Sequence, residues 1–322
     1  MPPTKRIRLQ AGDSAAEAFC GAFPTIEHFL TTTEEDWKRG SGNKSRTIQG
    51  QSTDLYEIGI QYLEDHVAPP VISGTALLKS LQTTSKLLST GCESLDNLLR
   101  GGVRGGHHTE LVGPSASGKT QLCLSVALSS ARRGSRVVYI DTSNSFSGSR
   151  VASINESRGP CGTPLKAVLG NITVYHSHDI FSVLHVLDEL ALQMSKVLDG
   201  AQLPEVLVLD SVSSVVTPVL GGGQRHSHGH TLMVSLGRML KVVAESFGMA
   251  VVSTNHEVGG PSRPRPALGD SWLNQPHLRI HLSKVAGEAD ACYATVKTSA
   301  VLPRDKSTVV RLCAGAGVVS AH

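Results

Sequence analysis

The sequence predicts an α/β domain in which a mostly parallel sheet carries helices on both faces. From about residue 86 onward, short apolar runs alternate with amphipathic stretches, which is typical of strands joined by crossover helices. Many of these runs are apolar throughout, as in strands that are buried on both faces. The last runs follow one another without helices between them, so we expect the sheet to finish with antiparallel strands.

The expected elements follow this pattern in chain order. Helices are predicted at 119–133, 179–198 and 231–247, and the second of them carries apolar residues at helical spacing from Phe181 to Leu198. The predicted strands are 109–112, 136–141, 171–176, 205–210, 249–254, 278–282, 292–297, 307–313 and 317–319.

The segment before this α/β core has a different texture. Apolar residues between Leu55 and Val67 recur at helical spacing, which indicates a small helical N-terminal domain at 1–67. Ala68, Pro69 and Pro70 cannot continue a helix, so a linker is expected at 68–85 and the core at 86–322.

Composition bounds the class of protein. The 322 residues are 40% hydrophobic with a net charge of +3, which is ordinary for a globular protein. No apolar run approaches the roughly 20 residues of a membrane helix, and the N-terminus has no signal-peptide core. The six cysteines form no CxxC pair, so we expect reduced thiols in an intracellular protein. The low net charge requires that any contact with nucleic acid be local.

A short basic cluster stands near the start of the chain. Lys5, Arg6 and Arg8 have the character of a nuclear import signal, although such clusters are also common on solvated tails. We expect a nuclear location.

The clearest motif is a phosphate-binding loop. Residues 113–120, GPSASGKT, match G-x-x-x-x-G-K-[ST], and they follow a predicted strand and open a predicted helix. The glycines let successive backbone N–H groups face phosphate oxygens, and Lys119 is expected to reach the β and γ phosphates of ATP. The expected ATP-binding residues of this loop are Gly113, Pro114, Ser115, Ala116, Ser117, Gly118, Lys119, Thr120 and Gln121.

A second half of this site is expected at Asp210. This carboxylate ends the apolar run 206–210, where burial is costly unless a partner compensates it. Mg²⁺, bound also by the Thr120 hydroxyl, is the natural partner beside a phosphate-binding loop. A simple capping role for Asp210 at the next turn is the alternative.

These segments together resemble one family. Thr90-Gly91-x-x-x-Leu95-Asp96-x-Leu98-Leu99-x-Gly101-Gly102 precedes the loop, and Tyr139-Ile-Asp-Thr142 and the strand ending in Thr254-Asn255-His256 follow it. Over roughly 70–322 the chain resembles the eukaryotic and archaeal RecA/RadA-type recombinases. Ala76-Leu77-Leu78 and Pro266-Ala-Leu-Gly269-x-Ser271-Trp272 resemble the D-type recombinase paralogue. The resemblance implies a RecA-like P-loop ATPase core.

Three positions matter for catalysis under this resemblance. Where the family carries a water-activating glutamate the chain has Ser143, and where it has a γ-phosphate-sensing glutamine the chain has His256. Serine is a poor general base, so ATP binding is expected to be intact and hydrolysis impaired. Arg150 falls where the family has an arginine near the nucleotide.

The resemblance also implies two loops that face single-stranded DNA. The first corresponds to Val219–His230 and the second to about 257–276, and the expected phosphate contacts are Arg225, Arg263 and Arg265. Aromatic residues make up 4% of the chain, which argues against a base-stacking platform. The alternative is that a partner protein covers both loops.

The first of these loops is rich in histidine. On an extended chain His226, His228 and His230 would point the same way, which suggests zinc. No acidic or cysteine ligand stands near them in the sequence, so solvated histidines are the preferred interpretation.

Family members assemble by inserting a phenylalanine of the linker into a neighbouring core. The linker here has Ile72-Ser-Gly-Thr75 at the matching distance, so self-filaments are not expected and other recombinase paralogues are the expected partners.

Two functional classes remain open within this family, a DNA-stimulated ATPase and a scaffold clamped by ATP. An unrelated RecA-fold helicase or signalling ATPase fits the phosphate-binding loop but not the segment Thr90–Gly102.

Overall fold

The computed structural model describes residues 46–48, 51–53, 73–78, 86–196, 202–221, 225–258, 265–313 and 315–320. The chain divides into two compact units, Met1–Leu77 and Leu78–His322. In the first unit β1 (Arg46–Ile48) pairs antiparallel with β2 (Gln51–Thr53). The helix predicted between Leu55 and Val67 lies outside the described residues, and of the predicted linker 68–85 the segment 74–78 is helical.

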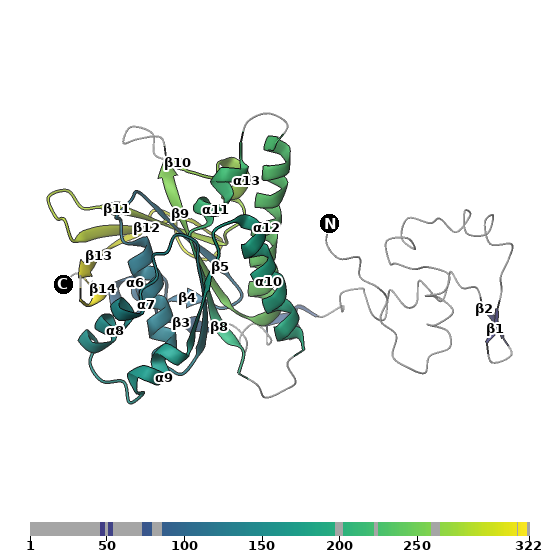
Figure 1. Cartoon of the computed structure of the whole chain (residues 1–322), viewed down its shortest axis with the longest axis horizontal. Helices are drawn as coiled ribbons and strands as arrows, with labels where there is room; N and C mark the ends of the chain where they lie inside the picture. Colours follow the sequence, from purple (N-terminus) through teal and green to yellow (C-terminus); the bar gives the residue numbers. More distant parts are fainter. Residues whose placement is uncertain are drawn as a thin grey trace. The chain divides into compact units, whose positions relative to one another are not determined.

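The second unit is built on one large sheet. Its strand order is β14-β13-β12-β11-β5-β9-β8-β6-β7, and β10 pairs with β9 outside this path (Figure 1). The strands from β11 to β7 run parallel, whereas β12, β13 and β14 continue antiparallel at one end. The predicted α/β fold with an antiparallel finish is therefore confirmed. The bounds are β5 His108–Gly113, β6 Arg136–Asp141, β7 Ile172–His176, β8 Pro204–Asp210, β9 Ala250–Val258, β10 Arg265–Pro266, β11 Leu278–Lys284, β12 Ala291–Ser299, β13 Ser307–Cys313 and β14 Gly317–Ser320.

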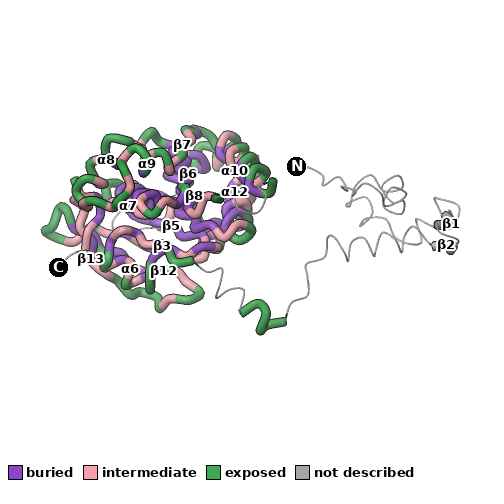
Figure 2. The backbone as a smooth tube through the Cα atoms, turned by 90° about the horizontal axis from the view of Figure 1, so that it is seen from below, coloured by how far each residue is buried: buried purple, intermediate pink, exposed green. Residues whose placement is uncertain are grey.

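Helices cover both faces of the sheet and enclose two cores. Along β6, Val137 and Tyr139 face one core while Val138 and Ile140 face the other, as the two-residue period of a strand requires. Figure 2 shows the central strands as buried and the outer faces of the helices as exposed. The first core contains α6 (Glu93–Leu98), α7 (Lys119–Arg132), α8 (Gly148–Ser157) and α9 (Leu165–Gly170), and the second contains α10 (Ile180–Ser195), α11 (Val212–Val216), α12 (Arg225–Phe247) and α13 (Asp270–Leu273).

The remaining described elements are short. β3 (Leu87–Leu88) pairs antiparallel with β4 (Val103–Arg104), and η1 (Thr217–Val219) is a single 3₁₀ turn. The sequence prediction omitted α8, which is largely polar. In that helix only Val151 and Ile154 are buried, and the Ser147 hydroxyl caps its start by accepting from the Arg150 N–H.

The parallel strands place four chain segments at one edge of the sheet. Gly113 at the end of β5 is in register with His256 on β9, and Asp141 at the end of β6 is in register with Asp210 at the end of β8. Residues that end neighbouring parallel strands lie side by side, so this edge is where a ligand site is expected.

Candidate functional site

The predicted phosphate-binding loop joins β5 to α7. A Cβ atom at Gly113 would lie 2.4 Å from the Leu282 carbonyl oxygen, so backbone packing requires glycine there. Gly118 has a φ of 91°, which favours glycine, and α7 begins at the next residue, Lys119. The loop therefore presents backbone N–H groups at the start of a fourteen-residue helix.

The Lys119 side chain lies inside this loop and is 7% exposed. Its ammonium group donates to the carbonyl oxygens of Gly113 at 2.8 Å and Pro114 at 2.7 Å. Burial lowers the pKa of Lys119, and the negative charge of Asp210 opposes that shift. The cation is thus held by uncharged carbonyl groups close to the position where phosphates are expected.

Asp210 ends β8 and is 3% exposed. Its carboxylate accepts hydrogen bonds from the hydroxyls of Tyr139 at 3.0 Å, Ser145 at 3.2 Å and Thr254. Burial, followed by the charge of Asp210, raises the pKa of Tyr139 well above its usual value, so the phenol remains a donor. Among the described residues, the hydrogen-bond donors to Asp210 are all neutral, and its charge is available to an external cation.

The turn after β6 is shaped by a second buried carboxylate, Asp141. It accepts from the backbone N–H groups of Ser143 at 3.2 Å, Ser145 at 3.1 Å and Phe146 at 2.9 Å. This turn brings Ser143 to the cleft beside Asp210. Asp141 therefore acts in positioning the turn.

His256, on β9, lies on the other side of Asp210. Its backbone N–H donates to the Ser213 hydroxyl at 3.1 Å. Burial and the positive charge of Lys119 lower the pKa of His256, against the opposing effect of Asp210. The imidazole is therefore neutral at neutral pH and retains one N–H donor.

These side chains line one cleft with a volume of about 440 Å³. Most of the predicted nucleotide-site residues line it, including Arg150, whereas Gly113, Pro114 and Ser117 do not. Sequence analysis missed Ser211, Leu312 and Cys313, since no local motif marks them. The lining residues are Ser115, Ala116, Gly118, Lys119, Thr120, Gln121, Ser143, Arg150, Asp210, Ser211, His256, Leu312 and Cys313.

The chain is similar to proteins of DNA repair and recombination. The sequence model of the Rad51 family matches residues 83–314. The chain belongs to the Rad51 family. It is 39% identical to the DNA repair protein RAD51 homolog 4 of Mus musculus over 276 residues, which cover 79% of this chain and 82% of that protein. The resemblance to the RecA/RadA-type recombinases and to one of their paralogues is confirmed, and so is the RecA-like core.

More distant members of the Rad51 family match a shorter part of the chain. The DNA repair and recombination protein RadB of Halobacterium salinarum is 33% identical over 204 residues, which cover 62% of this chain and 82% of that protein. The meiotic recombination protein DMC1 homolog of Arabidopsis thaliana is 31% identical over 219 residues, which cover 64% of this chain and 61% of that protein.

On the side expected to face DNA, this Rad51-family chain differs from the prediction. Residues 225–230 are not an extended loop, because α12 begins at Arg225, and Val219 ends the short helix η1. Three alternating positions do not share one face of a helix, so the geometric argument for zinc at His226, His228 and His230 is wrong. Arg265 lies in β10, which pairs with the end of β9, and Arg263 lies outside the described residues.

Another buried carboxylate, Glu110, has its charge paired within the described part of the chain. Glu110 on β5 is 0% exposed and forms an ion pair with Arg279 on β11. It also accepts from the Trp272 indole at 2.6 Å and the Asn255 amide at 2.9 Å. Because each donor comes from a different element, Glu110 ties α13, β9 and β11 to β5.

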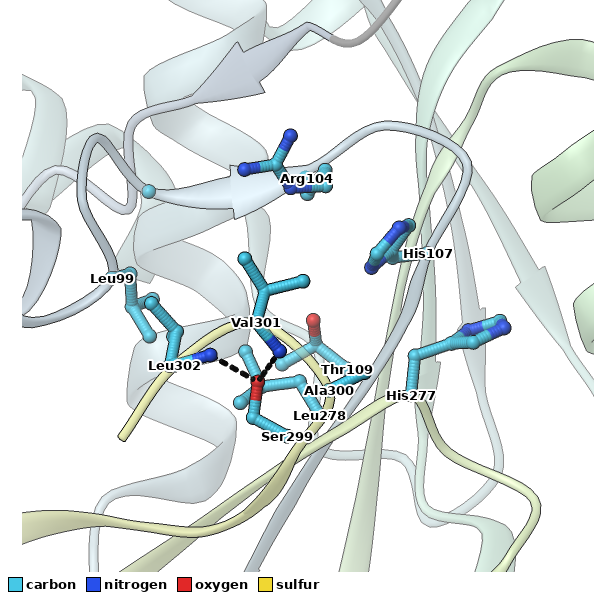
Figure 3. Close-up of a pocket in the computed structure, with 11 residues that line it drawn as sticks. Leu99, Arg104, His107, Thr109, His277, Leu278, Ser299, Ala300, Val301 and Leu302 are labelled. Carbon is cyan, nitrogen blue, oxygen red and sulfur yellow. Dashed lines mark hydrogen bonds between the residues drawn. The ribbon is translucent and has the colours of Figure 1, made fainter. Parts of the chain in front are cut away.

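A small cavity of about 80 Å³ lies near the opposite, amino ends of β5 and β11 (Figure 3). The rings of His107 and His277 border it with their centroids 5.0 Å apart. Burial and the neighbouring His277 and Arg104 lower the pKa of His107 to about 4. The cavity has room for a few water molecules and is too small for a nucleotide.

No described helix has the length and apolar character needed to cross a membrane.

Proposed function

We propose that this chain is an ATP- and Mg²⁺-binding recombinase paralogue that acts in homologous-recombination repair of DNA in the nucleus. The observation that carries this proposal is the cleft itself. It combines a buried lysine whose hydrogen-bond acceptors among the described residues are carbonyl groups with a buried carboxylate whose donors in the same part of the chain are hydroxyls. A triphosphate complements the first of these groups and a divalent cation the second.

The residues of the cleft have separate roles in this proposal. Lys119 exchanges its carbonyl partners for oxygens of the β and γ phosphates, while N–H groups of the loop hold the same phosphates. Thr120 and Asp210 supply a hydroxyl and a carboxylate oxygen, which are ligand types that Mg²⁺ prefers, so the residues present fit this ion. Bound Mg²⁺ would neutralise phosphate charge. His256 donates to the γ-phosphate, and Arg150 contacts the nucleotide.

The hydrolytic step is expected to be weak. Among the described residues that line the cleft, Asp210 is the single carboxylate, and Ser143 occupies the position where the family has a glutamate. A serine hydroxyl does not accept a proton from water at neutral pH. The scaffold clamped by ATP is therefore favoured over the DNA-stimulated ATPase. Membership of the Rad51 family argues against an unrelated helicase.

DNA and protein partners complete the proposal. RAD51 homolog 4 is named a DNA repair protein in its own organism. We infer contacts of Arg225, Arg263 and Arg265 with the phosphates of single-stranded DNA, and assembly with other recombinase paralogues through an N-terminal domain at 1–67 and a linker at 68–85. The basic cluster Lys5, Arg6 and Arg8 supports a nuclear location.

The nucleotide part is tested by titrating ATP with and without Mg²⁺ into the parent and Asp210→Asn. The amide keeps the size of the side chain but removes its charge, so Mg²⁺ should strengthen binding to the parent and not to the variant. Asp188→Asn, an exposed position of α10 outside the cleft, is the control. Equal Mg²⁺ dependence in parent and Asp210→Asn rules out Asp210 as a metal ligand.

The proposed DNA binding is tested with the chain purified together with its partner proteins. The affinity for single-stranded DNA should fall steeply as the salt concentration rises, and Arg225→Ala and Arg263→Ala should each lower the affinity equally for all DNA sequences. Arg136→Ala, at the exposed start of β6, serves as the control. A strong base preference, or unchanged affinity in both variants, contradicts the assignment.

A further inference from the structure

Few side chains of the cleft can accept a proton from water. The ionisable residues that line it are Lys119, Arg150, Asp210, His256 and Cys313. Lys119 and Arg150 are cations, and Asp210 is the expected ligand of Mg²⁺. Cys313 ends β13, which the strand order places across β5 from Asp210. Among the described lining residues this leaves His256, because a serine hydroxyl is a poor proton acceptor.

His256 stands between the phosphate-binding loop and Asp210. In the sheet β9 lies between β5 and β8, and His256 is in register with Gly113, the first residue of the loop. Thr254 donates to Asp210, and side chains two residues apart on a strand share one face. The imidazole therefore lies one strand period, about 6.6 Å, beyond the contact between Thr254 and Asp210.

The ring of His256 is open to a ligand. Its backbone N–H donates to the Ser213 hydroxyl at 3.1 Å, which fixes where the side chain leaves the strand. The side chain is exposed and lines the cleft, and neither ring nitrogen forms a hydrogen bond with a described residue. In contrast, the ring of the buried His108 contacts the Ser253 hydroxyl at 2.7 Å. The imidazole of His256 is thus placed by its backbone and unengaged at its ring.

We propose that His256 is the general base of a slow ATP hydrolysis by this chain, and that it accepts a proton from the water that attacks the γ-phosphate. This inference rests on the proposed nucleotide site and adds a catalytic residue to it. The base then belongs to β9, on the other side of Asp210 from Ser143, where the family has its glutamate. A neutral imidazole carries one bare nitrogen besides its N–H, so the ring that contacts the γ-phosphate also holds a proton acceptor.

The hydrolytic step balances with ATP and water alone. The water oxygen forms a bond to the γ-phosphorus while the bare nitrogen of His256 takes one proton of that water. The bond between the γ-phosphorus and the oxygen that bridges it to the β-phosphorus breaks, and its electron pair leaves with ADP. The imidazolium then releases its proton to solvent, which regenerates the base.

The charge state of His256 suits this role. Burial, followed by the positive charge of Lys119, lowers the pKa of His256, and Asp210 opposes that shift. Arg150 also lines the cleft, whereas Glu257 belongs to the opposite face of β9 and forms an ion pair there. At neutral pH the imidazole is therefore the neutral base. The hydrolysis rate should fall as the pH drops through the folded pKa, which lies below the ordinary value of 6.5.

The experiment compares the isolated full chain with His256→Gln and with His185→Gln, which changes an exposed position of α10 outside the cleft. Glutamine still donates a hydrogen bond to phosphate but does not accept a proton at neutral pH. Fluorescence titration should give about the same ATP affinity for all three proteins. Phosphate release from ATP, followed over hours with Mg²⁺ and single-stranded DNA, should fall at least about tenfold in His256→Gln and stay unchanged in His185→Gln.

Chemical rescue separates proton transfer from a purely structural role. His256→Ala removes the ring and leaves space for it, so free imidazole added to the solution should raise hydrolysis by this variant. The same imidazole should not raise hydrolysis by His256→Gln, because the amide fills the space. The pH profile is the second readout. The rate of the parent should fall between about pH 7 and about pH 5, and the residual rate of His256→Gln should not.

Three results overturn the inference while the nucleotide site stands. Equal hydrolysis by the parent and His256→Gln, with ATP bound by both, assigns the proton to another group. Loss of hydrolysis without rescue by imidazole and with an unchanged pH profile makes His256 a phosphate contact alone. A parent that binds ATP and releases no phosphate above background has no general base. If titration detects no ATP binding by the parent, the proposed nucleotide site fails and this inference fails with it.

Discussion

Two buried carboxylates in this molecule have opposite surroundings. Glu110, on β5, is paired with the Arg279 guanidinium and accepts two further N–H donors. Asp210, on β8, accepts three hydroxyls and lines an open cleft. Both are almost inaccessible to water, yet of the two only Glu110 forms an ion pair with a described cationic side chain.

The difference distinguishes a structural carboxylate from one that awaits a ligand. Removing a carboxylate from water is costly, and the protein compensates that cost either with an internal cation or with an external one. Where the compensation is internal, the cluster joins elements of the fold. Where the carboxylate accepts only hydroxyl hydrogen bonds from described residues and lies beside a buried lysine, the site is suited to a charged ligand that carries its own cation.

The comparison is tested most strongly by Arg279→Met, which leaves Glu110 buried without its cation. We expect the free energy of unfolding to fall by about 3–5 kcal/mol, the usual cost of breaking a buried pair. Urea unfolding measures it. Arg311→Met is the matched control, because Arg311 pairs with Glu288 and Asp290 at the surface and should contribute less than about 1 kcal/mol. If the free energy of unfolding falls by the same small amount in both variants, the ion pair of Glu110 contributes no more than an ion pair at the surface.

The next effect concerns the cation of the cleft. Lys119→Ala removes a buried ammonium group that faces two phosphates, so ATP affinity should fall roughly 100-fold or more. Fluorescence titration measures it, with Lys166→Ala on the exposed side of α9 as control. If the Lys119 variant binds an ATP analogue as tightly as the parent does, the loop does not bind phosphate.

His108 is a third buried ionisable group, and it needs no compensating charge because it stays neutral in the folded chain. Burial, reinforced by His277, Lys241 and Arg279, lowers the pKa of His108 to about 3, from 6.5. Below about pH 6.5 the unfolded chain binds a proton that the folded chain does not. The free energy of unfolding therefore decreases as the pH is lowered, by up to about 1.4 kcal/mol per pH unit.

Urea unfolding at about pH 7 and about pH 5 measures how the free energy of unfolding depends on pH. In His108→Gln this dependence should be weaker, because about one proton fewer is taken up on unfolding. Glutamine keeps a side-chain amide that can contact the Ser253 hydroxyl, the present partner of His108 at 2.7 Å. An unchanged slope in the variant would mean that His108 titrates normally in the folded chain.

The smallest expected effect concerns ATP hydrolysis, because the cleft beside Asp210 has Ser143 where the family has a glutamate. Ser143→Glu adds a carboxylate at the cleft, and ATP hydrolysis by the isolated chain with single-stranded DNA should rise at least about tenfold from a near-background rate. Ser143→Gln, similar in size and uncharged, should give no gain. Brisk hydrolysis by the parent that disappears in Asp210→Ala would show that another residue activates water.

Much of the core was predictable because its signals are local. Apolar runs bounded by turn residues identify buried strands such as Arg136–Asp141, and the glycines and lysine of 113–120 define a loop by themselves. The prediction was wrong at 225–230, since the glycines and polar residues of this region suggested a loop where α12 already begins at Arg225. Partly buried helices such as α8 were missed because two apolar residues give no clear period.

The sequence by itself determined the fold class, the glycine-rich loop at 113–120 and the position of Asp210 at the end of a strand, because each depends on residues close together in the chain. Only the tertiary structure decided that Asp210 is bound by hydroxyls, that Glu110 is paired with Arg279, and that Leu312 and Cys313 reach the cleft. Those contacts join strands far apart in the sequence. The order of strands in the sheet brings them together, and no local pattern of residues records that order.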